Sequence, residues 1–207
     1  MCGITGFLNL HPSSKDKALS VLQNMTGSLE HRGPDATGYW MDPNGMIAFG
    51  HRRLSILDLS DAGSQPMASI CGRFVLTFNG EIYNHLSLRR DLEKNISIQW
   101  KGASDTETLI EAISYWGLID TLKKLRGMFA FALWDKKLEI LSLARDPIGE
   151  KHLYYGWQGK TFLFGSELKA LKEHPDFQKK VSTNSLSLFL LHNYVPAPYS
   201  IFQGINK

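Results

Sequence analysis

The first residues of this chain, MCGITGF, combine groups that can do amide chemistry. Once Met1 is removed, Cys2 carries both a thiol and a free α-amine, and the reference pKa of such an amine is about 7.7–8.0. The amine can then act as a base close to the sulfur, an arrangement that needs no histidine or aspartate partner. These residues alone leave two interpretations open: Cys2 is a nucleophile, or it is an incidental residue at a chain start that tolerates change.

A nucleophile of this kind needs an oxyanion hole, and FNGEIYN, residues 78–84, offers candidate donors. Asn79 supplies a side-chain amide, and Gly80 supplies a backbone N–H that no side chain shields. The loss of one such donor typically lowers the rate by about 10²–10³. Asn-Gly is also a common pair in hairpin turns. The residues alone leave both interpretations open.

Charged residues in apolar surroundings indicate where a substrate could be held. GHRRLSILDL, residues 50–59, places Arg52 and Arg53 in an otherwise apolar, strand-like run. An arginine that points into a pocket suits bidentate binding of a carboxylate, although a solvated arginine is the commoner outcome. Asp105 begins a predicted helix, where it could cap the helix or receive a ligand ammonium.

The composition is typical of a soluble globular protein, with 43% apolar and 21% charged residues among 207. This length fits one large domain or at most two small ones. The formal net charge of +3 is spread without runs, so the sequence favours neither nucleic acid nor an anionic membrane as a partner. Cys2 and Cys71 form no disulfide framework or paired metal motif, which suits a cytoplasmic protein, and we expect Cys71 to be a small apolar filler. No signal-peptide pattern and no membrane-spanning apolar run is present.

Hydrophobic periodicity predicts strands grouped together and helices set apart from them. Strands are predicted at residues 3–10, 46–57, 73–80, 128–135, 137–146, 151–157 and 161–167. Helices are predicted at residues 14–30, 87–94, 104–116 and 185–192. Ser104 and Glu107 have capping-box spacing, and Gly117 is placed to end that helix. The grouping favours a layered α+β fold with antiparallel pairing over βαβ winding.

Sequence blocks taken in order along the chain resemble the glutaminase domain of asparagine synthetase. The blocks are MCGITGF, LEHRGPDATG (29–38), GHRRLSILDL, FNGEIYN, SDTETLIEA (104–112), GMFAFALWD (127–135) and FGSELKAL (164–171). HRGPD and NGEIYN together are similar to the asparagine synthetase branch rather than to other class II glutamine amidotransferases. The resemblance implies an N-terminal-nucleophile hydrolase fold, a four-layer αββα sandwich of two antiparallel sheets, over residues 2–207.

The resemblance also implies a reaction and a set of roles. Cys2 would attack the side-chain amide of glutamine, forming a γ-glutamyl thioester and releasing ammonia, and Asn79 and Gly80 would be the oxyanion donors. The implied glutamine-binding residues are Arg53 for the α-carboxylate, Glu81 and Asp105 near the α-amine, and the backbone of Leu54, Ser55, Ile56 and Leu57. His31, Arg32 and Asp35 of HRGPD are expected to support the nucleophile rather than to react.

Two departures from the family pattern bear on the rest of the protein. RDPIGEKHLYYG, residues 145–156, has Pro147, Glu150 and His152 where the family often reads RDRxGxKPLYY, so the ammonia route or acceptor half is expected to differ. No SGGxDS-like pyrophosphate loop is present. We therefore expect no cofactor or metal in this domain. ATP and Mg are expected only in a C-terminal ATP-dependent synthetase domain outside this chain, acting in cis or in trans, with aspartate as the default acceptor.

Other functions stay open besides an excised glutaminase domain. The chain could be a free-standing or non-catalytic module that senses glutamine or docks a partner, or a hydrolase of the same fold that acts on another amide. Retention of the whole predicted site argues against the first, and a clamp for both an α-amine and an α-carboxylate argues against the second. If a synthetase domain covers one face, residues 145–156 and the stretch from Ser185 onward should expose apolar surface and favour self-association, as in a homodimer.

Overall fold

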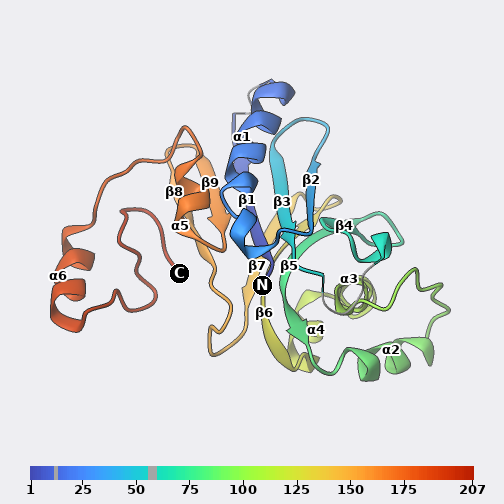
Figure 1. Cartoon of the computed structure of the whole chain (residues 1–207). Helices are drawn as coiled ribbons and strands as arrows, with labels where there is room; N and C mark the ends of the chain where they lie inside the picture. Colours follow the sequence, from blue (N-terminus) through green and yellow to red (C-terminus); the bar gives the residue numbers. More distant parts are fainter. Residues whose placement is uncertain (12–13, 56–59) are drawn as a thin grey trace.

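The computed structural model describes residues 1–11, 14–55 and 60–207, and its strands form two antiparallel sheets (Figure 1). The first sheet has the order β2-β3-β1-β9-β8, formed by Ala36–Met41, Ile47–Arg53, Gly3–Asn9, Thr161–Gly165 and Tyr154–Gln158. The second has the order β4-β5-β6-β7, formed by Met67–Ala68, Phe74–Ile82, Gly127–Asp135 and Ile140–Arg145. The predicted antiparallel pairing is confirmed at every strand pair of both sheets.

Helices cover the outer face of each sheet. Helices α1 (Lys15–Gly27) and α5 (Leu168–Lys172) bury Leu22 and Leu171 against Phe7 of the first sheet. Helices α2 (His85–Glu93), α3 (Asp105–Trp116) and α4 (Leu118–Lys124) pack on the second sheet, where Ile110 and Ile113 of α3 join its apolar side chains. Helix α6 (Thr183–His192) lies apart from these layers at one side of the molecule (Figure 1).

A third apolar cluster lies between the two sheets. Phe49 and Phe164 of the first sheet pack with Val75 and Trp134 of the second, and all four side chains are buried. Burial of each such side chain contributes about 1.5–3 kcal/mol. The result is the αββα sandwich that the family resemblance implies.

Side-chain alternation along β3 and β5 decides which residues face the space between the sheets. Phe49 of β3 lies in the cluster between the sheets, so Arg53, four residues later, faces the same way and Arg52 faces away. Val75 of β5 lies in that same cluster, so Asn79 also points toward the first sheet. The last residues of β3 and of β5 therefore meet at one end of the sandwich.

The sequence pattern does not predict β2, β4, α4 or α5. Strand β2 has no buried side chain, so no apolar alternation marks it, and the other three elements are too short to show a period. The helix predicted to reach residue 30 ends at Gly27 and is followed by a 3-10 turn, η1 (Glu30–Arg32). A second 3-10 turn, η2, spans Asp61–Gly63. Among the described residues, no helix has both the length and the apolarity to cross a bilayer.

The expectation that Cys71 is an apolar filler is wrong. Cys71 is exposed, and its Sγ lies 3.3 Å from the hydroxyl of Ser69 and 3.3 Å from that of Ser114. It follows β4 in a turn at the molecular surface, where polar neighbours replace the core contacts that a filler would make.

His51 of β3 joins the two sheets close to their convergent ends. Its side chain is buried, and its Nε2 donates a hydrogen bond of 3.1 Å to the carbonyl oxygen of Phe78 in β5. Burial lowers the pKa of His51 to about 4, and the nearby Arg53 charge acts in the same direction, while the bond to Phe78 opposes the shift. His51 is therefore neutral at physiological pH.

Acid should destabilise the fold through His51. Its reference pKa of about 6.5 applies to the unfolded chain, while the folded pKa is about 4, so the unfolded chain binds more protons between these values. The contribution of neutral His51 to the free energy of unfolding is complete above about pH 6.5. It falls as the pH is lowered, and about 3 kcal/mol of it is lost at pH 4. Urea unfolding of His51→Gln should therefore show a flatter pH dependence than the wild type between pH 7 and 4. Identical slopes would show that another group carries the acid sensitivity.

Candidate active site

A pocket of about 130 Å³ lies at the convergent ends of the two sheets. It brings together predicted site residues from distant parts of the chain: Cys2, Arg53, Leu54, Asn79, Gly80, Glu81 and Asp105. Ser55 is not among the lining residues, and its backbone N–H donates to Asp35 instead (2.8 Å). Ile56 and Leu57 lie outside the described residues.

Cys2 immediately precedes β1, and its sulfur faces the end of β3. The Leu54 N–H lies 3.4 Å from Cys2 Sγ, and the Leu54 carbonyl oxygen lies 3.6 Å from it. Burial raises the pKa of the Cys2 thiol, and this outweighs the opposing effects of the Leu54 hydrogen bond and of the nearby positive charges. The thiol therefore needs a base before it can attack a substrate. No histidine is among the described residues that line the pocket.

The HRGPD segment contacts the backbone of Cys2 and stabilises its position. Arg32 Nε donates to the Cys2 carbonyl oxygen at 2.9 Å, and its Nη1 pairs with Glu167 at 2.9 Å. His31 Nε2 lies 2.9 Å from the same Glu167 carboxylate. A Cβ on Gly33 would lie 2.5 Å from the backbone of Arg52, so only glycine lets this segment lie against the end of β3. These contacts agree with the supporting role expected for HRGPD.

Asn79 lies inside a strand, which excludes the hairpin-turn interpretation of Asn-Gly. It belongs to β5 and pairs with Ala130 of β6, while Gly80 pairs with Phe129. Asn79 is 2% exposed, and its Nδ2 has no hydrogen-bond partner among the residues that the structure describes. A buried donor left unpaired costs about 1–3 kcal/mol. This amide is therefore available to a ligand in the pocket.

Gly80 presents its backbone N–H to the same pocket. The Phe78 N–H donates to Gln65 Oε1 at 2.6 Å, and the Ile82 N–H donates to Asp105 Oδ2 at 2.9 Å. Alternate N–H groups of a strand point to the same edge, so the Gly80 N–H lies between these two and points away from β6. A Cβ on Gly80 would lie 2.3 Å from the Met128 carbonyl oxygen, which excludes larger residues here.

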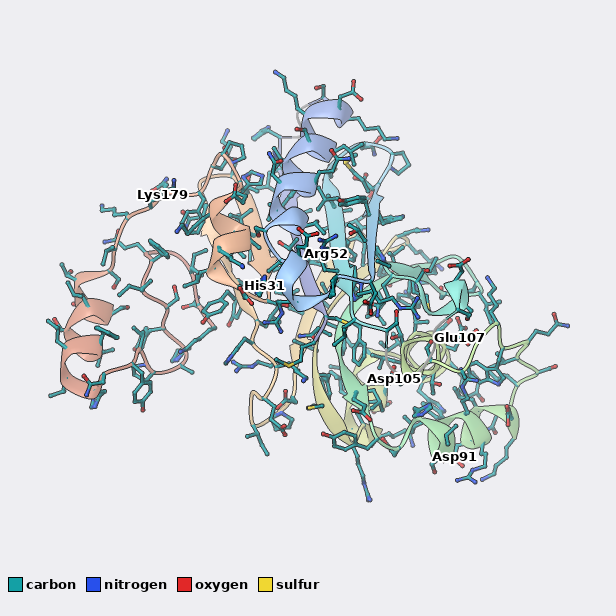
Figure 2. The ribbon with its side chains drawn as sticks, in the orientation of Figure 1. His31, Arg52, Asp91, Asp105, Glu107 and Lys179 are labelled. Atoms are coloured by element: carbon teal, nitrogen blue, oxygen red, sulfur yellow. The ribbon has the colours of Figure 1, made fainter. Side chains whose placement is uncertain are left out.

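The two arginines of GHRRLSILDL have different environments. Arg53 is 9% exposed, lines the pocket, and donates through Nη1 to the Ser60 carbonyl oxygen at 2.9 Å. Arg52, labelled in Figure 2, lies on the opposite face of the sheet and pairs with Glu30 of η1 at 2.9 Å. The solvated-arginine alternative is therefore excluded for Arg53.

Asp105 reaches the pocket from the first turn of α3, next to β5 (Figure 2). It is 5% exposed, and burial raises the pKa of its carboxyl, more than the hydrogen bond from Ile82 lowers it. Capping does not account for this residue. Ser104 is the N-cap, and its hydroxyl accepts from the Glu107 N–H at 3.2 Å, as the capping-box spacing predicts.

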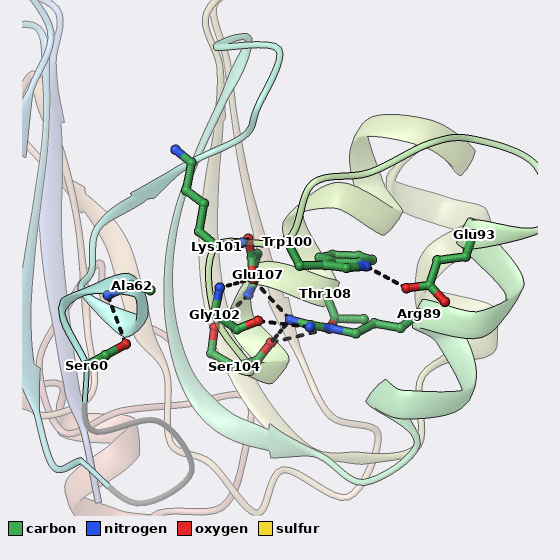
Figure 3. A network of polar contacts seen from close by, with 10 residues as sticks. All are labelled: Ser60, Ala62, Arg89, Glu93, Trp100, Lys101, Gly102, Ser104, Glu107 and Thr108. Atoms are coloured by element: carbon green, nitrogen blue, oxygen red, sulfur yellow. Dashed lines mark hydrogen bonds and ion pairs between the residues drawn. The ribbon is translucent and has the colours of Figure 1, made fainter.

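A polar network fixes the turn that precedes Asp105 (Figure 3). Glu107 does not complete the capping box; its carboxylate accepts from the backbone N–H of Lys101 at 2.7 Å and of Gly102 at 3.1 Å. Arg89 pairs with Glu107 at 3.0 Å and donates to the Gly102 carbonyl oxygen at 2.9 Å. Its guanidinium also lies 4.1 Å from the centre of the Trp100 ring. These contacts hold the start of α3, and with it Asp105, in one position.

The charges of the pocket suit a zwitterionic ligand better than a metal ion. Arg53 and Lys151 are the cations that line it, and Glu81 and Asp105 are the anions. In the part of the chain that the structure describes, no group of three or more His, Cys, Asp or Glu side chains is placed to hold a metal. Gln65 and Lys151 line the pocket although sequence reasoning missed them. Lys151 had a signal, because it lies in the RDPIGEKHLYYG block.

Comparison with known proteins agrees with this geometry. Residues 1–207 match the family described as the glutamine amidotransferase domain. The chain is 37% identical over its full length to asparagine synthetase [glutamine-hydrolyzing] 3 of Bacillus subtilis, and covers 33% of that protein. It is 33% identical over its full length to a putative asparagine synthetase [glutamine-hydrolyzing] 2 of Methanocaldococcus jannaschii, and covers 42% of it. The chain thus spans only about a third to two-fifths of the length of these curated relatives.

A solved structure supports the fold. The chain superposes on the glutamine phosphoribosylpyrophosphate amidotransferase from B. subtilis, solved with ADP and GMP, with a TM-score of 0.68. The match covers 83% of this chain and 43% of that one, at 24% identity. The shared arrangement is a sandwich of two antiparallel sheets between layers of helices, which confirms the predicted fold. Together with the family match over its whole length, this places the chain in the glutamine amidotransferase family.

Proposed function

We propose that residues 2–207 form the glutaminase domain of an asparagine synthetase-like protein, which hydrolyses glutamine to glutamate and ammonia. The observation that carries the proposal is the convergence, in one pocket, of the Cys2 thiol with the unpaired amide of Asn79. A thiol beside an unused oxyanion donor suits acyl transfer. The names of the relatives, which specify glutamine hydrolysis, point to the same reaction.

The reaction requires that Met1 has first been removed, which leaves the Cys2 α-amine free. The amine takes the thiol proton as Sγ attacks the δ-carbon of glutamine, and Asn79 Nδ2 and the Gly80 N–H hold the resulting oxyanion. The amine then gives its proton to the departing nitrogen, which leaves as ammonia when the C–N bond breaks. Water attacks the γ-glutamyl thioester in the same way, releasing glutamate and restoring the thiol.

Charge complementarity would select glutamine as the substrate. Arg53 would bind the α-carboxylate, and Asp105 and Glu81 would receive the α-ammonium. Burial raises the pKa of Asp105 in the free protein, so a ligand ammonium beside it would favour the charged carboxylate again. An uncharged amide would not complement the charges of Arg53, Asp105 and Glu81, so it should bind less well.

The first prediction from the proposed function concerns the nucleophile. Cys2→Ala should abolish glutamine hydrolysis while leaving the melting temperature unchanged, because a residue at the chain start contributes little packing. A glutamine analogue with a leaving group at the δ-carbon should label Cys2 and spare Cys71, which is exposed and serves as an internal control. Peptide mass spectrometry measures the labelling. Activity that survives Cys2→Ala, or labelling at Cys71, would contradict the mechanism.

The second prediction separates binding from chemistry. Arg53→Ala should mainly raise KM for glutamine, because the carboxylate contact is similar in the ground and transition states. Asn79→Ala should instead lower kcat by about 10²–10³, because its amide matters most once the oxyanion forms. Steady-state ammonia release measures both parameters. Arg52→Ala is the matched control, since that arginine faces away from the pocket and should leave KM unchanged. If Asn79→Ala changed only KM, the oxyanion role would be withdrawn.

We also propose that an ATP-dependent synthetase domain, which would hold ATP and Mg and use aspartate as the default acceptor, covers the α6 face. Leu190 and Leu191 are each 74% exposed, and Tyr194 is 60% exposed. A groove of about 560 Å³ separates α6 from Tyr154 and Leu168. Exposed apolar residues gathered on one element indicate a surface that another body covers.

The third prediction tests this face. Light scattering over a concentration series should show that the chain alone self-associates, because the α6 face is uncovered. Leu190→Glu with Leu191→Glu should suppress the association by placing charge on that face. The matched control is Leu138→Glu, since Leu138 is 56% exposed but lies between β6 and β7. A strictly monomeric wild type would favour a free-standing glutaminase and remove the support for a synthetase partner.

A further inference from the structure

Lys151 is a buried cation in the pocket whose contact would not survive maturation of the chain. Its side chain is 6% exposed and lines the pocket together with Cys2. Its Nζ lies 3.2 Å from Met1 Sδ, and no other described residue forms a polar contact with that ammonium. A thioether is only a weak acceptor. Lysine is seldom buried without an anionic partner. The burial of Lys151 beside a thioether therefore suggests that its charge has a function in the pocket.

The loop that carries Lys151 is held from both sides. The Asp146 carboxylate accepts from the backbone N–H groups of Gly149 (2.6 Å), Glu150 (2.9 Å) and Lys151 (3.1 Å). The Arg145 guanidinium donates to the carbonyl oxygens of Gly149 and of Lys151 (2.8 Å). Gly149 has φ +77, and a Cβ there would lie 2.5 Å from Arg145. These contacts fix the backbone of Lys151, so its direction into the pocket is set by the fold.

Removal of Met1 would change what Lys151 faces. The Met1 thioether would leave, and the new chain end would be the Cys2 α-amine. Cys2 itself stays in place, because Arg32 holds its carbonyl oxygen at 2.9 Å and the Leu54 N–H lies 3.4 Å from its sulfur. A methionine side chain spans at most about 6 Å from the next residue's nitrogen to its sulfur. The ammonium therefore lies within roughly 9 Å of the amine, with no side chain of residue 1 left beside it.

We propose that Lys151 is a positioning residue whose ammonium faces the Cys2 α-amine and holds that amine as the free base at neutral pH. The inference rests on the proposed function, in which this amine is the base. A neighbouring positive charge disfavours a second one, so the amine releases its proton more readily. The same charge favours the thiolate that forms when Cys2 gives up its proton. Lys151 would thus set the pH range in which the nucleophile is ready.

The expected size of the effect follows from the distance. At an effective dielectric constant of about 20, a unit charge roughly 9 Å away shifts a pKa by about one unit. The other charged groups around Cys2 are Arg32, Arg53, Glu81 and Asp105. All four are present in both the wild type and a Lys151 variant, so a comparison of the two reports the lysine charge alone.

The test is the pH profile of kcat/KM for glutamine in Lys151→Met. Its acid limb should move to higher pH by about one unit, so that activity near pH 6.5 falls about tenfold and the two curves converge above about pH 9. Lys151→Arg keeps the charge and should restore the wild-type profile. Lys172→Met, which removes an exposed lysine of α5, is the matched control and should leave the profile unchanged. A superimposable profile in Lys151→Met, or a shift to lower pH, would overturn the inference.

A second readout does not depend on activity. The pH dependence of α-amine acylation, followed by mass spectrometry of the N-terminal peptide, should shift in the same direction and by the same amount in Lys151→Met. Methionine has a similar length and removes a buried charge, so the melting temperature of Lys151→Met should not fall. A lower melting temperature with an unchanged acylation curve would assign Lys151 a structural role instead. Loss of the requirement for Cys2 would refute the proposed function itself. An unmoved acid limb with Cys2 still required would refute only the role of Lys151.

Discussion

The pocket depends on how closely the two sheets approach at the ends of β1, β3 and β5. Within the second sheet, Gly80 allows β5 to lie against β6, because a Cβ there would lie 2.3 Å from the Met128 carbonyl oxygen. The hydrogen bond from buried His51 to the Phe78 carbonyl oxygen joins β3 to β5 directly beside Asn79. With the separation fixed, alternation along each strand decides which side chains meet. The Arg53 side chain points toward the second sheet, and the Asn79 side chain points toward the first. Arg52 points the opposite way and pairs with Glu30.

The same region carries polar groups that a purely structural core would not tolerate. Asn79 Nδ2 and His51 Nδ1 are buried and have no hydrogen-bond partner in the described part of the chain. Asp105 is buried enough that the pKa of its carboxyl is raised, and Lys151 is buried against a thioether. Each group lowers stability in the free protein. Asn79, Asp105 and Lys151 line one pocket, and His51 lies beside it. Such a concentration of costly polar groups is typical of a site for binding and chemistry rather than of a core built for folding.

Much of the fold and part of the site could be predicted from the sequence. Strong apolar runs such as residues 128–135 became strand β6, because a strand between two neighbours is buried along its length. Cys2, Arg53 and Asn79 were found through residue type and block order. Gln65 was missed because it has no local pattern, and it enters the pocket through long-range packing. Lys151 lies in the RDPIGEKHLYYG block, but that block does not indicate that its side chain reaches the pocket. Whether Asn79-Gly80 is a turn or a strand could not be decided locally either, since the answer depends on the partner strand β6.

Cys2, the proposed nucleophile, lies beside a chain end, and chain ends are usually disordered. Contacts to the backbone of residues 2 and 3 order this chain start, in addition to the contact of the Leu54 N–H with the Cys2 sulfur. Arg32 holds the carbonyl oxygen, and the following residues enter β1, where Gly3 pairs with Arg52. In the proposed mechanism, the thiol and the α-amine left by removal of Met1 would be free to react while held within an ordered pocket. The arginine is in turn fixed by Glu167, which follows β9 on the other side of β1. Order at the chain start is thus supplied by three segments far apart in sequence, which explains why the HRGPD and FGSELKAL blocks accompany the terminal cysteine.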